Sequence, residues 1–176
     1  LVAGENFVSS PTSTNRIDQF DVRIDQQVGR QSSLSCRYSF GDGYLYEPFS
    51  GPGFAAVPGF GTNIPRRAQN LVLTETHTFL PTILNEVRLG FGRVAFGSFH
   101  ENQGMSLNQS VGLPELSDNP RDFGLSFITV TGYSPLGDEY NNPQHSVANT
   151  FIASDNLTWA HNTHLLKFGG DGHVIQ

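Results

Sequence analysis

The chain has 176 residues, of which only 15% are charged, while glycine (19 residues) and phenylalanine (14 residues) are plentiful. Soluble domains carry about 25% charged residues, so this composition favours β-structure with long loops. The formal net charge is −6 and no run of Lys or Arg occurs, which argues against a nucleic-acid partner, because phosphate binding needs a clustered basic face. No stretch of 18 apolar residues is present, so no membrane-spanning helix is expected.

The first two predicted strands are residues 17–25 and 33–40, joined by a turn at 27–30. In the first strand, three apolar side chains alternate with three charged ones: Phe20, Val22 and Ile24 against Asp21, Arg23 and Asp25. The second strand sets Leu34, Cys36, Tyr38 and Phe40 against Ser33, Ser35, Arg37 and Ser39. Because successive side chains of a strand point to opposite faces, each run has one apolar and one polar face, and the pair is typical of a β-hairpin.

The next two predicted strands are residues 68–79 and 83–96, separated by a tight turn at Pro81-Thr82. The two faces of 68–79 differ little in polarity, so the sequence leaves the facing of this strand undecided. In 83–96 the alternation returns, with one side apolar and the other polar: Val87, Leu89 and Phe91 against Glu86, Arg88 and Gly90.

The last two predicted strands are residues 149–159 and a run that begins after 160–163. One side of 149–159 is apolar: Phe151, Ala153, Leu157 and Trp159. Ile152 and Asp155 break this pattern, which leaves open either a β-bulge or a charge on the apolar face. The final run sets Leu166 and Phe168 against Lys167 and Asp171, and Leu165 joins the polar face.

The connections alternate between short turns and two long loops, at about 41–66 and about 97–148. In an up-and-down barrel every second connection emerges at the same rim, and outer-membrane barrels combine short periplasmic turns with long extracellular loops. The fold class predicted is therefore all-β: an antiparallel up-and-down transmembrane β-barrel, of which this chain supplies about six strands. Residues 125–133 have β-propensity and are expected to form an extra strand within the second loop. The alternative is a soluble or secreted antiparallel β-domain that binds glycan or protein through aromatic-rich loops.

Several segments resemble one family in order and spacing: DQFDVRID (18–25), RYSF (37–40), THTFLPT (76–82), NEVRLGF (85–91), SDNLTW (154–159) and HLLKFGGD (164–171). They are similar to the barrel of Oar-like TonB-dependent transporters, in which a carboxypeptidase-regulatory-like domain and a plug precede the barrel. The resemblance implies a barrel of about 22 strands and active uptake of a ligand. Two positions depart from the family pattern, since the family has a small residue such as Gly at Cys36 and an aromatic or basic pair at Gly172-His173.

Under this interpretation residues 1–176 are part of one outer-membrane β-barrel domain, and the plug and the remaining strands lie outside the chain. Residues 1–5 have no basic or apolar signal region and residues 174–176 have no terminating signal, so both ends are expected to lie within a longer chain. The partners implied are outer-membrane lipid, the remaining strands and plug of the parent chain, TonB through that plug, and a transported ligand that the sequence does not identify. The location implied is the bacterial outer membrane.

Two sets of residues are predicted to have roles in such a barrel. The charges on the polar faces are predicted to line the lumen: Asp21, Arg23, Asp25, Arg37, Glu86, Arg88, Lys167 and Asp171. Their mixed signs suit a water-filled wall in which neighbours pair across strands. Aromatic residues near strand ends are predicted to form the interfacial girdles: Tyr38, Phe40, Trp159 and Phe168.

Neither an enzyme nor a cofactor is expected, because the sequence has no nucleophile elbow, no HExxH helix and no phosphate-binding glycine loop. His161 and His164 lie in a predicted turn without a Cys or Glu beside them, so a metal site is not expected there. The acidic and amide residues of 138–142 could offer oxygen ligands to calcium, but they lack the spacing of a calcium-binding loop. With Cys36 alone, no internal disulfide can form.

Overall fold

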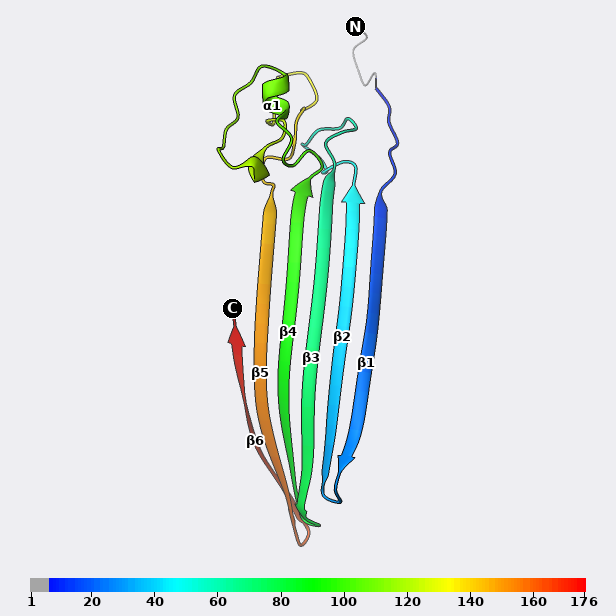
Figure 1. Ribbon diagram of the computed structural model, residues 1–176, viewed down its shortest axis with the longest axis vertical. Helices are drawn as coiled ribbons and strands as arrows, with labels where there is room; N and C mark the ends of the chain where they lie inside the picture. Colours follow the sequence, from blue (N-terminus) through cyan, green and yellow to red (C-terminus); the bar gives the residue numbers. More distant parts are fainter. Residues whose placement is uncertain (1–6) are drawn as a thin grey trace. The chain divides into compact units, whose positions relative to one another are not determined.

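The computed structural model describes residues 7–176, so the expectation about residues 1–5 lies outside the described part. The strands are β1 (Thr14–Val28), β2 (Ser32–Glu47), β3 (Thr62–Leu80), β4 (Ile83–His100), β5 (Gln144–His161) and β6 (His164–Ile175). They form one six-stranded sheet in chain order, as Figure 1 shows, which confirms the predicted antiparallel up-and-down architecture. Among residues 7–176, helical structure is limited to α1 (Leu107–Ser110) and the short 3-10 helix η1 (Pro120–Asp122). In the described part of the chain, no helix has the length and apolar character needed to cross a membrane.

The chain divides into two compact units. Unit 1 contains the described residues up to Ile17 together with Gly43–Arg66 and Phe96–Ser146. Unit 2 contains Asp18–Asp42, Arg67–Ala95 and Val147–Gln176. Unit 2 therefore holds the three short turns and the strand segments next to them, while unit 1 holds the two long connections.

The strands extend further than the apolar alternation predicted, so the long loops are shorter. The first loop runs over 48–61 instead of about 41–66, and the second over 101–143 instead of about 97–148. Glycines at 41 and 43 interrupt the alternation without ending the strand. Pairing continues beyond them, where the Tyr44 hydroxyl donates to Asn63 Oδ1 and Ser13 Oγ donates to the Tyr46 carbonyl at 2.9 Å.

The prediction of an extra strand at 125–133 was wrong. Only an isolated bridge between Ile128 and Leu136 forms there. The chain turns at Gly132, whose φ is +86°, and the Leu125 amide donates to the Asp138 carboxylate instead of to a neighbouring strand. The β-propensity of this segment is overridden by hydrogen bonds that the sequence pattern does not contain.

Contacts between the strands define two faces of the sheet in unit 2. On one face the Phe20 ring stacks on Phe40, with 5.4 Å between ring centroids. On the other face Arg37 Nη2 donates to Asp21 Oδ1 at 3.2 Å. The alternation therefore separates an apolar face from a polar face in the β1–β2 hairpin.

The same contacts settle the facing of β3, which the sequence left undecided. Ser32 and Phe40 are both even-numbered residues of β2 and therefore lie on the same, apolar face. His77 Nδ1 lies 2.6 Å from Ser32 Oγ, so the odd-numbered residues of β3 share that apolar face. The even-numbered residues Thr74 and Thr76 line an open hollow together with the charged side chains of the neighbouring strands. Thus β3 contributes hydroxyls to the polar face.

The irregular pattern in β5 reflects a charge on the apolar face and not a bulge. Pairing of β5 with β6 runs without interruption from Thr150↔Ile175 to His161↔His164. Asp155 therefore shares the face of Phe151, where it accepts a hydrogen bond from Asn85 Nδ2. Ile152 faces the polar side and packs over Gly90, where an added Cβ would lie 3.4 Å from the Ile152 Cβ.

The sheet has no apolar core. Among the described residues, Ala55 is the only buried hydrophobic residue, and large apolar side chains of unit 2 such as Ile24 (65% exposed) and Phe168 (57% exposed) have little protein around them. The alternative considered above, a soluble or secreted antiparallel β-domain, would bury its apolar residues, for example between two packed sheets with a shared core. The described residues form one sheet only, so the apolar face requires an apolar environment that this part of the chain does not supply.

The β5–β6 turn offers a test of the backbone assignment. Asn162 is the one non-glycine residue in the described chain with positive φ, at +53°. Since branched side chains are strained in this left-handed region, we expect Asn162→Val to lower the free energy of unfolding by about 1–2 kcal/mol and Asn162→Gly to leave it nearly unchanged. Urea unfolding of the folded protein, with Thr163→Val as the control, measures this. Equal stability of the Val and Gly variants would contradict the turn geometry.

Candidate functional site

The polar face of unit 2 contains all eight charges predicted to line a lumen. Three ion pairs join six of them: Asp21 with Arg37 at 3.2 Å, Arg23 with Asp25 at 2.8 Å, and Glu86 with Arg88 at 3.0 Å. The other two, Lys167 and Asp171, lie opposite Thr158 and Ser154 of β5. Thr158 and Ser154 are even-numbered, like Ile152, and so lie with it on the polar face. That this face lines a lumen remains a prediction.

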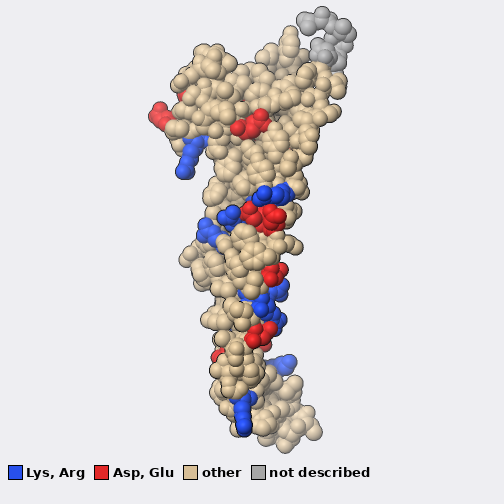
Figure 2. Space-filling model, turned by 45° about the vertical axis from the view of Figure 1, so that its right-hand side comes forward, with Lys and Arg blue, Asp and Glu red and all other residues tan. Residues whose placement is uncertain are grey.

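These ion pairs are solvated and of mixed sign. The side chains of Asp21 and Arg37 are 54% and 57% exposed, so water screens their attraction and they contribute little to stability. On the face shown in Figure 2, acidic and basic side chains lie next to one another and not in separate regions of one sign. An open hollow of about 580 Å³ runs over this face, between Arg23 and Asp25 of β1 and Glu86 and Arg88 of β4.

The predicted girdle residues occupy two levels of the apolar face. Tyr38 and Phe40 lie with Phe20, near the part of β2 that enters unit 1. Trp159 and Phe168 lie near the β5–β6 turn, with Phe168 opposite Leu157. On β5 alone, positions 151 and 159 are about 26 Å apart along the strand at about 3.3 Å per residue. This distance is close to the apolar band of about 25 Å between aromatic girdles, and the girdle itself remains a prediction.

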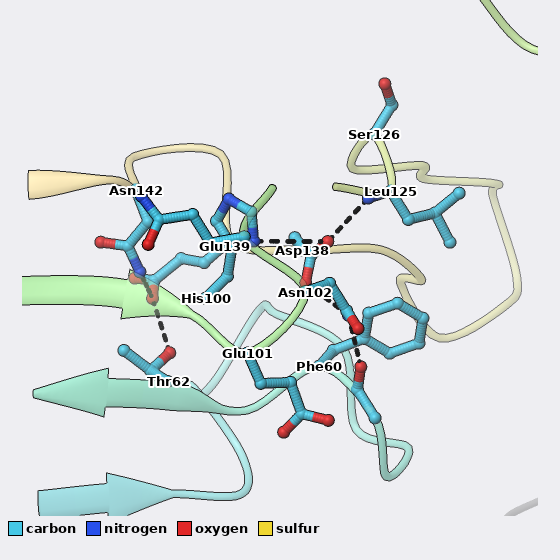
Figure 3. A network of polar contacts seen from close by, with 12 residues as sticks. Phe60, Thr62, His100, Glu101, Asn102, Leu125, Ser126, Asp138, Glu139 and Asn142 are labelled. Carbon is cyan, nitrogen blue, oxygen red and sulfur yellow. Dashed lines mark hydrogen bonds and ion pairs between the residues drawn. The ribbon is translucent and has the colours of Figure 1, made fainter. Parts of the chain in front are cut away.

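A second candidate site lies in unit 1, where the long connections build a buried polar network (Figure 3). Asp138 is its centre, with only 5% of the residue exposed. Its Oδ2 accepts from the Leu125 amide at 2.7 Å and its Oδ1 accepts from Asn102 Nδ2 at 2.9 Å. His100, 4% exposed, places Nδ1 3.6 Å from Asp138 Oδ2. An added Cβ at Gly124 would lie 2.5 Å from the same oxygen, so glycine is needed beside this pair.

The neighbouring side chains are held by similar bonds. Glu139 Oε2 accepts from Asn142 Nδ2 at 2.9 Å and from Thr62 Oγ1 at 3.3 Å. Asn108 Oδ1 accepts from the Ser126 amide at 2.8 Å, and Asn108 Nδ2 donates to Glu115 Oε2 at 3.3 Å. Two of these bonds, Thr62 with Glu139 and Asn108 with Ser126, join residues that are far apart in sequence.

Another carboxylate in unit 1, that of Glu101, anchors the first loop. Glu101 Oε2 accepts hydrogen bonds from the Tyr46 hydroxyl and from the Gly61 amide, the latter at 3.1 Å. The hydrogen bond to the Glu101 carboxylate, together with burial, raises the pKa of Tyr46 to about 12. Tyr46 therefore remains a hydrogen-bond donor at physiological pH.

Within this network lies a cavity of about 320 Å³. Its lining includes four carboxylates and no Lys or Arg: Glu115, Asp122, Asp138 and Glu139. Three buried polar atoms of the lining lack a hydrogen-bond partner: His100 Nδ1, Glu115 Oε1 and Asn142 Oδ1. Each such atom costs about 1–3 kcal/mol if nothing satisfies it, so the cavity is suited to a group that donates hydrogen bonds or carries positive charge.

Sequence reasoning found only part of this cavity. It singled out the residues 138–142 but missed His100, Asn108 and Glu115, because no local spacing connects them. His161 and His164, the other metal candidate, face each other in register across the β5–β6 turn. Across the described residues, no group of three or more His, Cys, Asp or Glu side chains is placed to hold a metal ion.

Removal of the Asp138 carboxylate tests the network. We expect Asp138→Ala to leave the half-buried Leu125 amide and Asn102 without their acceptor, at a cost of about 1–3 kcal/mol. The Leu125 amide should then exchange with solvent about 5- to 150-fold faster by hydrogen–deuterium exchange. Asp118→Ala, an exposed carboxylate of the same loop, is the control. Unchanged exchange in the Asp138 variant would mean that the network does not hold the loop.

Comparison with known proteins agrees with this architecture. No curated protein and no solved structure matches the chain. The family described as "Outer membrane beta barrel domain" matches residues 2–176. This match spans nearly the whole chain and fits a single antiparallel sheet with one apolar and one polar face. The chain therefore belongs to the outer membrane β-barrel domain family, which confirms the predicted location in the bacterial outer membrane.

Proposed function

We propose that the chain forms part of the wall and outer loops of a TonB-dependent transporter of the Oar-like kind, which takes up a ligand actively. The observation that carries this proposal is the sheet of unit 2, which has two different faces. One is polar, with solvated acidic and basic side chains, and the other is apolar and exposed. A pore wall needs both, because one side meets water and the other meets lipid. The resemblance of the strand segments to Oar-like barrels supports the finer assignment.

The strand segments of unit 2 have the length that this role requires. They are residues 18–28, 32–42, 67–80, 83–95, 147–161 and 164–175. A tilted strand needs about 9–11 residues to cross the apolar part of a bilayer, and each segment is at least that long. We assign these segments to the membrane and the strand extensions in unit 1 to the water outside it.

The alternation of connections supports an orientation. In outer-membrane barrels the short turns are periplasmic and the long loops extracellular. On this rule the turns at 29–31, 81–82 and 162–163 face the periplasm, and the connections at 48–61 and 101–143 face the outside. The polar cavity of unit 1 would then be accessible to molecules outside the cell.

The proposal includes further strands and a plug. The sheet order begins with β1 and ends with β6, and every residue of these two strands is exposed. Bacterial barrels close with eight or more strands, so the free edges of β1 and β6 require partners. We assign that role to other strands of the parent chain, and coupling to TonB to its plug.

A charge placed on the apolar face tests the membrane wall. Leu89 lies midway along the β4 segment of unit 2 and is 50% exposed. We expect Leu89→Arg to destabilise the protein by about 2–4 kcal/mol, because the guanidinium would enter the bilayer. Thr74→Arg, on the polar face, should cost far less. Urea unfolding in phospholipid vesicles measures both, and equal losses would contradict the assignment of the faces.

Transport itself is tested with the complete protein in a planar lipid bilayer. A plugged transporter should conduct poorly, and deletion of the plug should open a large, stable conductance. The periplasmic domain of TonB should also bind the complete protein. An open channel in the complete protein, or a gene without a plug upstream of this chain, would favour a passive pore instead. The proposed role is not enzymatic, so substrate turnover that is lost on replacing a loop carboxylate would contradict it.

A further inference from the structure

We infer that the cavity of unit 1 binds the positively charged end of a small organic ligand, an ammonium or guanidinium group. This inference deepens the proposed function and rests on it, since a ligand captured by the outer loops would be the cargo or part of it. Three observations carry it: the charge of the cavity, its unsatisfied atoms and its aromatic wall.

The charge of the cavity selects for a cation. Its lining holds four carboxylates and neither Lys nor Arg, and His100 is the only side chain there that can become positive. Two of the carboxylates, Asp138 and Glu139, are anchored by hydrogen bonds from the loops and so remain in place. An anionic ligand would meet uncompensated repulsion in such a site.

The unsatisfied atoms select for a donor of hydrogen bonds. Glu115 Oε1 and Asn142 Oδ1 are acceptors, both are buried, and neither has a donor. His100, only 4% exposed, also has no hydrogen bond at Nδ1, and this nitrogen is a further acceptor in the tautomer that carries its hydrogen on Nε2. Ammonium offers three N–H donors and guanidinium five, which suits several acceptors in one small space.

The aromatic wall distinguishes an organic cation from a metal ion. Phe127 and Tyr140 line the cavity, and their ring centroids lie 5.5 Å apart. Phe54 packs against both, at 5.9 Å from Phe127 and 5.6 Å from Tyr140. Aromatic faces attract ammonium and guanidinium groups, whereas they offer no ligand to calcium or magnesium. A volume of about 320 Å³ is also at the lower end of pockets for small molecules.

The test is calorimetric titration of the complete detergent-solubilised protein with benzylamine and agmatine. Benzyl alcohol and glutarate serve as the neutral and anionic controls, and calcium chloride as the metal control. We expect both cations to bind and the controls to be silent. Glu115→Gln should weaken binding at least about tenfold, because it removes one negative charge from the lining, while Asp118→Asn, outside the cavity, should not change it.

A second pair of variants keeps the test valid if Glu115→Gln alters the loops. Tyr140 is 73% exposed, so its replacement should not affect folding. Tyr140→Leu should weaken the binding of both amines about two- to fivefold and Tyr140→Phe should preserve it. Binding of calcium alone, equal binding of benzyl alcohol, or no binding of either amine would overturn the inference. None of these outcomes bears on conductance or TonB binding, which test the proposed function separately.

Discussion

The whole architecture depends on a sheet that has no second layer. Alternation in β1 puts Phe20 and Asp21 on opposite faces, and contacts across the sheet continue this separation to β6. The apolar face then has no protein against it, so in water it would lose the hydrophobic stabilisation that normally holds a domain together. A bilayer replaces the missing layer. It also requires every backbone group to be paired, which is why closure of the sheet by further strands follows from the same constraint.

Unit 1 and unit 2 are each stabilised by a different kind of interaction. Every buried residue of the described chain lies in unit 1, and the most buried polar ones are Thr62, His100, Asn108 and Asp138. Unit 1 is therefore ordered by hydrogen bonds to carboxylates and amides in the long connections, with little apolar burial. Unit 2 has exposed ion pairs and no buried side chain, so lipid and the strand ladder must supply its stability.

The sequence predicted those strands in which apolar and polar residues alternate regularly. In β1 and β4 a two-residue rhythm was enough to assign both faces before any contact was known. In β3 the two faces have similar polarity, and only its neighbours Ser32 and Tyr38 reveal its facing. The face on which Asp155 lies could not be assigned without the register of β5 against β6. A β-bulge and a charged residue on the apolar face produce the same sequence pattern. The cavity was not predictable, since residues between 100 and 142 are brought together by hydrogen bonds that have no periodic signature.

The two polar surfaces of the chain differ in their balance of charge. On the wall, Arg23, Arg37 and Arg88 each pair with a carboxylate, so the surface holds no ion of one sign strongly. In the cavity, the lining has carboxylates but no Arg or Lys, and two buried acceptors, Glu115 Oε1 and Asn142 Oδ1, have no donor. A surface of balanced charge lets a solute pass, whereas an acidic enclosure retains a cation long enough for recognition. Under the proposed function, the acidic loop site would capture a cation and the wall of balanced charge would let it pass.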